Sequence, residues 1–207
     1  MSTVEQKIVR KLAIMQTLAL MGFCVMSERS VLAETFVLKM APSSLSDWKD
    51  GAFYDNGGRA PTGSGTDVIS ISPSVPRVEV SGEDASVVSF LGGISRVICS
   101  NSTFAISVES KEVNFPGAID DDQALKGVLE KTGRGTLNLL AHKKWSSGGT
   151  THDYEIGVHV KEGTLRLPRV DAGTFNLYEH VRVENGAVLI TPDQAAFQVR
   201  GFGVLAW

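Results

Sequence analysis

Apolar and polar residues alternate with a period of two along most of the chain beyond residue 60. This alternation places successive side chains on opposite faces of a strand, so one face can be buried while the other meets water. The runs are short, and Gly, Asn, Asp or Pro residues bound them. They cover residues 68–71, 77–80, 103–108, 136–140, 155–160, 164–167, 180–183 and 197–199. The pattern therefore predicts an all-β fold built from short strands.

One segment departs from the period of two. In residues 120–131 the apolar side chains of Ala124, Leu125, Val128 and Leu129 would share one helical face, but Gly127 in the middle disfavours a helix. We expect at most a short helical turn there. Asn-Gly pairs, the strongest hairpin signal, occur at residues 56–57 and 185–186. The second pair lies between two strand-like runs, so the sequence leaves a hairpin open at that point.

The chain also repeats itself. The sequences "GTLNL" at Gly135, "GTLRL" at Gly163 and "GTFNL" at Gly173 share one pattern, and "GAVLI" at Gly186 and "STFAI" at Ser102 are looser copies. The copies at Gly135, Gly163 and Gly186 follow one another at the spacing of roughly 20 to 30 residues that short-coil solenoids show. Short strands with a glycine corner in each unit are typical of parallel β-solenoids. An antiparallel β-sandwich has the same alternation, but the repeated corner favours a parallel β-helix or solenoid.

Stacking the copies predicts which side chains are buried, since one turn of a solenoid cannot cover its apolar side alone. Three polar side chains, those of Asn138, Arg166 and Asn176, should point outward. The side chains expected in one continuous interior are those of Leu137, Leu139, Leu165, Leu167, Phe175, Leu177, Val188 and Ile190.

Residues 128–167 carry a more specific pattern. A lysine, two glycines and "TLNL" are followed by an aromatic residue, "SSGGTT" and "GTL". The positions that match are Lys131, Thr132, Gly133, Gly135, Thr136, Leu137, Leu139, Trp145, Ser147, Gly148, Gly149, Thr150, Thr151, Gly163, Thr164 and Leu165. This stretch closely resembles the autotransporter-associated β-strand repeat of bacterial secreted and surface proteins. The resemblance implies a passenger-type β-solenoid in which "GGTT" forms a corner of the coil.

The resemblance also implies boundaries for the other parts of the chain. Residues 44–72 look like the tryptophan- and glycine-rich opening segment that precedes such repeats, so we expect an opening segment at 34–74 and a solenoid at 75–207. The link "HDYEIGVHVKE" between "GGTT" and "GTLRL" is longer than in the repeat pattern. The coil should therefore bulge or carry an extra strand there.

The N-terminal segment, residues 1–33, has the features of a secretory signal peptide. Lys7, Arg10 and Lys11 precede an apolar run at residues 12–26, and Val31 and Ala33 are small residues before a cut. The apolar run is shorter than the ~20 residues that a membrane-spanning helix needs. We expect cleavage between Ala33 and Glu34 and a secreted or cell-surface location.

Charge and cysteine content narrow the possible partners. Residues 34–207 contain 16 basic and 21 acidic side chains, a net charge of −5, which argues against a nucleic-acid-binding surface. After removal of the leader Cys99 is the one remaining cysteine, so an internal disulfide is excluded. We expect Cys99 to be a small buried apolar residue.

The sequence contains no strong catalytic, cofactor or metal motif. The glycine-rich segments at 58–67 and 132–136 lack the features of a phosphate loop or dinucleotide site. The four histidines have no metal-ligand spacing, and we expect them on the solvated surface, with His159 pointing outward from a strand. The acidic run Asp120–Asp122 lacks the spacing of a calcium loop. We therefore predict no cofactor.

An enzyme is the rival class, because many polysaccharide lyases and hydrolases are parallel β-helices. Such an enzyme needs acid and base groups that converge on one face of adjacent coils. The dense polar set near the repeats consists of Asp153, Glu155, Lys161, Arg166 and Arg169. Nothing in the spacing of these residues identifies a nucleophile or an acid–base pair.

The sequence favours a non-catalytic exported surface protein, structural or adhesive, whose chain is a short β-solenoid or a fragment of a longer one. The alternative is a carbohydrate-binding or polysaccharide-degrading β-helix module, in which exposed aromatic side chains would stack on sugars. The aromatic residues for that role are Trp48, Phe53, Tyr54 and Trp145. The segment "AHKKW" departs from the repeat pattern, so His142, Lys143, Lys144 and Trp145 form the candidate surface for a glycan or protein partner.

Overall fold

The computed structural model describes residues 33–121, 127–141, 145–147, 150–152, 156–168, 175–191, 195–199 and 204–206. The chain divides into two units, Met1–Leu32 and Ala33–Trp207, and the described residues all belong to the second. Within this described part, no helix is long and apolar enough to cross a membrane.

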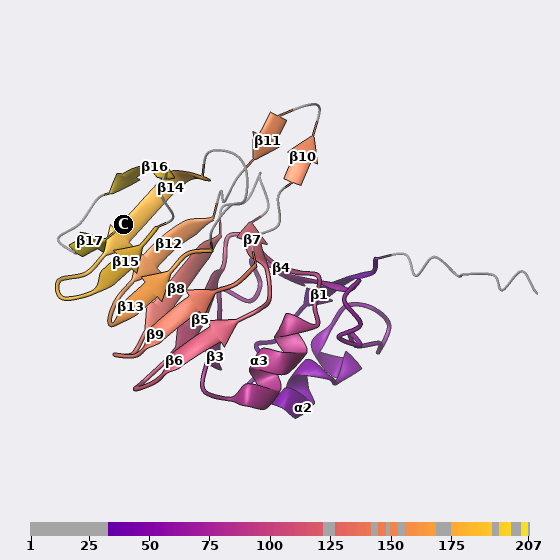
Figure 1. Cartoon of the computed structure of the whole chain (residues 1–207). Helices are drawn as coiled ribbons and strands as arrows, with labels where there is room; N and C mark the ends of the chain where they lie inside the picture. The colour runs from indigo at the N-terminus through magenta and orange to yellow at the C-terminus, as the bar shows by residue number, and fades with distance from the viewer. Residues whose placement is uncertain are drawn as a thin grey trace, which may run out of the picture. The chain divides into compact units, whose positions relative to one another are not determined.

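Three parallel sheets form the second unit (Figure 1). Sheet A contains, in spatial order, β1 (Thr35–Leu38), β2 (Val68–Ile71), β4 (Arg96–Cys99) and β7 (Ile119–Asp121). Sheet B contains β3 (Arg77–Ser81), β5 (Thr103–Ser107), β8 (Val128–Thr132), β12 (Gly157–Val160), β14 (Phe175–Val183) and β16 (Ala195–Val199). Sheet C contains β6 (Glu112–Phe115), β9 (Thr136–Leu139), β13 (Thr164–Arg166), β15 (Val188–Ile190) and β17 (Val204–Ala206).

The chain visits the sheets in rotation. It passes from β4 through β5 to β6, and then from β7 through β8 to β9, so that each strand lies beside its equivalent in the preceding turn. All strand pairs within the three sheets are parallel. This arrangement confirms the predicted parallel β-solenoid and excludes the antiparallel sandwich.

The interior is a stack of apolar rows. Leu137 of β9 pairs with Leu165 of β13, and Leu165 pairs with Leu189 of β15. All three side chains are fully buried. Leu139 and Leu167 are also buried, as predicted.

The predicted burial of Val188 and Ile190 is wrong. Thr164 pairs with Val188 and Arg166 pairs with Ile190, so both residues share the outward face of sheet C. The corner before β15 therefore aligns Ala187, rather than Gly186, with Gly163. A shift of one residue exchanges the two faces of a strand, because side chains alternate with a period of two.

The five copies of the glycine motif do not occupy one face. Those at Gly135, Gly163 and Gly186 lead into strands of sheet C, whereas those at Ser102 and Gly173 lead into β5 and β14 of sheet B. The residues at 185–186 form a corner between β14 and β15, which lie in different sheets, and not a hairpin. The side chains of Phe175, Asn176 and Leu177 lie outside the described residues.

The segment at residues 120–131, for which at most a short helical turn was expected, is described only at its two ends. Ile119 pairs with Val97, and Val128 pairs with Thr103, which makes strands of both ends of this segment. Gly127 lies against the preceding turn, since a Cβ atom there would be 2.3 Å from Cys99 Cβ. Residues 122–126 lie outside the description.

Short helices, which the period of two did not predict, accompany the first turn. α2 (Leu45–Trp48) begins with a capping box between Ser44 and Asp47, and η1 (Gly51–Phe53) follows it. α3 (Ala85–Gly92) is capped by Asp84, whose carboxylate accepts from two backbone N–H groups. α3 connects β3 to β4, where the next turns place a strand of sheet C.

An antiparallel hairpin interrupts the solenoid between β9 and β12. β10 (Trp145–Ser147) pairs with β11 (Thr150–His152), and these two strands form a sheet of their own. The expected bulge or extra strand was placed in the link at residues 152–162, whereas the hairpin lies before most of that link. Thr150 and Thr151 of "GGTT" belong to the antiparallel strand β11 and not to a corner between parallel strands. The two residues at 148–149 are not among those described.

Gly163 shows how closely successive corners stack. It adopts φ +67, and a Cβ atom there would lie 2.4 Å from the carbonyl oxygen of Gly135. Gly186 has a similar φ of +84 but has open space around it. We expect Gly186→Ala to cost about 1–2 kcal/mol of unfolding free energy from backbone strain. Gly163→Ala should cost about 1–3 kcal/mol more, because the backbone of the neighbouring turn must move.

Urea unfolding of the two variants and the wild type measures this difference. Equal losses in the two variants would contradict the close stacking of the corners at Gly135 and Gly163.

Candidate functional site

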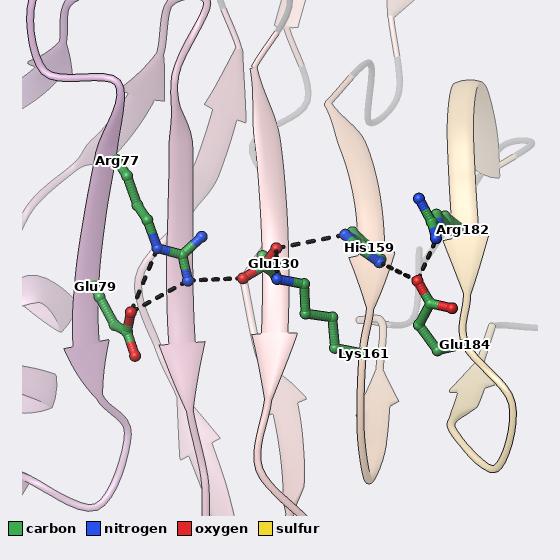
Figure 2. A network of polar contacts seen from close by, with 7 residues as sticks. All are labelled: Arg77, Glu79, Glu130, His159, Lys161, Arg182 and Glu184. Carbon is green, nitrogen blue, oxygen red and sulfur yellow. Dashed lines mark hydrogen bonds and ion pairs between the residues drawn. The ribbon is translucent and has the colours of Figure 1, made fainter.

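The outward face of sheet B carries a network of seven charged or polar side chains (Figure 2). They come from strands that are far apart in the sequence, and Figure 2 shows them side by side across the sheet. The members of this network are Arg77, Glu79, Glu130, His159, Lys161, Arg182 and Glu184.

The register of sheet B explains why these side chains meet. Glu79 pairs with Ala105, Ala105 with Glu130, Glu130 with His159, and His159 with Arg182. Neighbouring strands lie about 4.8 Å apart, so side chains in one row are within reach of each other. An outward side chain in one strand therefore lies beside the side chain at the paired position of the next turn.

Arg77 spans the largest step of the network. Its Nη2 atom lies 3.2 Å from Glu79 Oε2 and 2.7 Å from Glu130 Oε1, although 53 residues separate Arg77 from Glu130 in the sequence. Between them lies β5, which presents Ala105 in this row. The short side chain of Ala105 leaves room for the guanidinium to reach the third strand.

Glu130 is the centre of the network. Its side chain is only 6% exposed, and its Oε2 atom contacts Lys161 Nζ at 2.9 Å and His159 Nδ1 at 3.4 Å. Burial by itself would raise the pKa of Glu130, but the hydrogen bonds from Arg77 and Lys161 outweigh it and hold the pKa below its usual value. The carboxylate is therefore charged and fully paired at neutral pH.

His159 bridges two turns. Its Nε2 atom lies 3.0 Å from Glu184 Oε1, on the side opposite Glu130, and Arg182 Nε also contacts that oxygen at 2.8 Å. The hydrogen bond with His159 is the main reason that the pKa of Glu184 is lowered. His159 points outward as predicted, but its side chain is only 18% exposed, so its assignment to the solvated surface is wrong. The neighbouring carboxylates enclose it.

A second polar row lies on the outward face of sheet C. Asn138 Nδ2 donates to Glu112 Oε1 and to Asn114 Oδ1, both at 2.8 Å. Arg166 Nη1 lies 3.8 Å from the same Glu112 oxygen. Asn138 and Arg166 thus take the outward positions that the repeat predicts, and their side chains connect β6, β9 and β13.

Lys131 occupies an inward position of sheet B. It pairs with Ile106 on one side and Val160 on the other, and its side chain is fully buried. Its Nζ atom donates to the carbonyl oxygens of Thr132 at 2.6 Å, Gly133 at 2.5 Å and Glu162 at 3.1 Å. The ammonium therefore joins two successive corners between sheets B and C.

Burial lowers the pKa of Lys131 to about 8, although Glu162 and Glu109 act in the opposite direction. Lys131 therefore stabilises the two corners from inside the solenoid, through its hydrogen bonds to their carbonyl oxygens. It does not form part of an outer binding surface.

Other residues singled out in the sequence lie apart from these rows. Trp48 and Tyr54 are buried in the core, where the Tyr54 hydroxyl donates to the Trp48 carbonyl oxygen at 2.9 Å. They are therefore unavailable as sugar-stacking surfaces, and Phe53 is partly buried against the same core. Cys99 is buried, as predicted.

Asp120 lies in β7 and pairs with Arg96 at 3.2 Å. Among the described residues, no group of three His, Cys, Asp or Glu side chains is arranged to hold a metal ion.

The candidate partner surface is only partly covered by the structure. Trp145 is the first residue of β10, with its side chain undescribed, and His142, Lys143 and Lys144 lie outside the described residues. Of the dense polar set considered for an enzyme, Lys161 and Arg166 take part in the two outer rows, while Asp153, Glu155 and Arg169 are also outside the description.

No protein-family model, curated protein or solved structure matches the chain. Its function therefore has to be inferred from the geometry of its own residues.

The chemical capacity of the sheet B network follows from its pairing. Each of its three carboxylates contacts at least one cationic side chain of the network. A general acid or base needs a proton-transfer partner in the substrate, whereas these oxygens already face protein cations. The arrangement suits cohesion between turns better than catalysis.

Glu130→Gln should lower the free energy of unfolding by about 1–3 kcal/mol at neutral pH, because it removes charged acceptors from Arg77 and Lys161. The control is Glu79→Gln, which affects a 55% exposed partner of the same arginine and should cost no more than about 1 kcal/mol. Since the folded-state pKa of Glu130 is lowered, its contribution is present above pH 4.5 and is lost as the pH falls below that value. Denaturant unfolding between pH 7 and pH 2.5 measures both effects, and equal losses in the two variants at neutral pH would refute the central position of Glu130.

Lys131→Met tests the buried ammonium through the pH dependence of stability. The folded-state pKa of about 8 lies below the usual 10.5, so between these values the unfolded chain binds more protons than the folded one. The stability of the wild type relative to Lys131→Met should therefore rise by roughly 2 kcal/mol from pH 7 to pH 10. The control is Lys39→Met, which makes the same substitution at an exposed lysine. A relative stability that falls with pH would show that the three carbonyls outweigh burial and favour the ammonium.

Proposed function

We propose that this chain is a non-catalytic exported surface protein in which the β-solenoid is a structural support for an adhesive segment. The observation that carries this proposal is that the carboxylates on the outward face of sheet B are paired with cationic side chains of the same face. The charged side chains on sheet B hold β3, β8, β12 and β14 together. Side chains paired in this way stabilise the stack of turns and keep it rigid.

Export is supported by the leader features of residues 1–33, a basic start, an apolar run and small residues before the expected cut. The boundary between the two units of the chain falls between Leu32 and Ala33, one residue before the expected cleavage point at Ala33 and Glu34. The first strand starts at Thr35.

The adhesive segment is assigned to the link between β9 and β12. β9 ends at Leu139 and β12 begins at Gly157, yet β8 and β12 keep a continuous parallel register on either side of this link. A solenoid can thus carry an extra segment without disturbing its stack. The residues from His142 to Trp145 combine cationic and aromatic side chains, which suits an anionic or carbohydrate-containing surface partner.

Binding of residues 34–207 to a glycan array and to a panel of extracellular matrix proteins tests this proposal. The combined variant His142→Ser, Lys143→Ser, Lys144→Ser and Trp145→Ser should reduce binding at least about tenfold, equivalent to roughly 1.4 kcal/mol. The control variant Lys39→Ser, Met40→Ser and Lys111→Ser removes exposed cationic and apolar side chains elsewhere and should bind like the wild type. If the wild type binds neither set, the adhesive role is wrong and the structural role alone remains.

A further inference from the structure

The imidazole of His159 lies between two carboxylates that belong to different turns (Figure 2). Its Nδ1 atom is 3.4 Å from Glu130 Oε2 of β8, and its Nε2 atom is 3.0 Å from Glu184 Oε1, directly after β14. An ionised carboxylate can only accept hydrogen bonds. A neutral imidazole has one N–H group, whereas the protonated ring has two. Only the protonated ring can therefore donate to both turns.

Both carboxylates keep their charge over the range in which histidines titrate. Burial acts to raise the pKa of Glu130, but the hydrogen bonds from Arg77 and Lys161 hold it below its ordinary value. The hydrogen bond with His159 lowers the pKa of Glu184. Between about pH 5 and pH 8, His159 is therefore the member of the network whose charge can change.

Each carboxylate also has a cation that stays charged in this range. Lys161 contacts Glu130 at 2.9 Å, and Arg77 reaches the same carboxylate at 2.7 Å. Arg182 contacts Glu184 at 2.8 Å. Loss of a proton from the imidazole thus leaves both carboxylates paired, and it weakens only the link between them.

The contact between His159 and Glu184 lies at a boundary with little other ionic support. Lys161 and Arg134 each form an ion pair across the preceding boundary, between the turn of β8 and β9 and the turn of β12 and β13. Across the next boundary, to the turn of β14 and β15, the pair of His159 with Glu184 is the only ion pair between described residues. The described ionic contact at this boundary depends on a histidine, and not on a lysine or arginine.

We propose that His159 is a pH-sensitive link that attaches the turn of β14 and β15 to the rest of the solenoid more firmly at mildly acidic pH. In the neutral ring one nitrogen lacks a hydrogen and faces an ionised oxygen. The other nitrogen becomes an uncharged donor, whose hydrogen bond is roughly half as strong. The rigidity of the stack then follows the acidity of its surroundings, which is a property beyond structural support and independent of export.

The test compares the full-length wild type with His159→Gln, whose side chain can still form hydrogen bonds but does not titrate. Urea unfolding from pH 5 to pH 8.5 gives the unfolding equilibrium constant of each protein. The constant of the wild type, divided by that of the variant, should fall by about tenfold as the pH is lowered across this range, because protonation strengthens both contacts of the ring. A ratio that stays constant, or that rises, would overturn the proposal.

A second histidine in the same sheet provides the control. His180 precedes Arg182 in β14, and its side chain lies outside the described residues. His180→Gln should retain the pH dependence of the wild type. If His180→Gln removes this dependence and His159→Gln retains it, the titrating group is not His159 and the proposal is wrong.

Hydrogen exchange locates the effect within the stack. The Glu184 N–H donates to the Val160 carbonyl oxygen across the boundary in question, and the Lys161 N–H donates to the Lys131 carbonyl oxygen across the preceding one, both at 2.9 Å. The protection that the wild type gains over His159→Gln at the Glu184 amide should be severalfold larger at pH 5 than at pH 8. The Lys161 amide should change less. Equal changes at both amides would show that His159 does not act on the attachment of β14.

Discussion

Parallel pairing of equivalent residues in successive turns is the constraint on which the other features depend. Every residue of a strand lies about 4.8 Å from its equivalent in the next turn, so the side chains at equivalent positions form a row and contact one another. Apolar positions build the interior row of Leu137, Leu165 and Leu189. Polar positions build outer rows in which opposite charges must alternate, and the row of Glu79, Glu130, His159 and Arg182 meets that demand with Arg77 and Lys161 inserted between the carboxylates.

The same constraint separates what the sequence could predict from what it could not. Alternation and glycine corners are local patterns, so they predicted the solenoid, eight of its strands and the burial of Leu137 and Leu165. Register between turns is not local. A corner with one more residue before β15 exchanged the faces of Val188 and Leu189, and no pattern within the strand itself reports this shift. The helix α3 was missed although its signal is local. The capping residue Asp84 precedes apolar residues at helical spacing, namely Val87, Val88, Phe90 and Leu91.

The sheet B network could not be predicted from the sequence, because it also depends on the register between turns. Most of its residues stand in runs such as "RVEV", "VHVK" and "VRVE", each of which has the pattern of an ordinary half-buried strand. Glu130 stands in "VLEK", within the segment that the sequence assigned to a helical face. The signal lies in the complementary charges at equivalent positions of successive turns, and these positions can be matched only once the register is known. Lys131 was recognised as part of a motif, but the motif did not show that its ammonium turns inward to three carbonyl oxygens.

The corners and the long links differ in how much change the stack tolerates. Between sheets B and C the corners at residues 133–135 and 161–163 are equally short, and Lys131 and Gly163 bind them closely to one another. A residue inserted there would displace the carbonyl groups that receive the ammonium. The path from sheet C back to sheet B carries no such restriction, because it accommodates β7 in one turn and the β10–β11 hairpin in the next. The hairpin shows that the path from sheet C back to sheet B can carry an added segment while the parallel pairing of β8 with β12 is preserved.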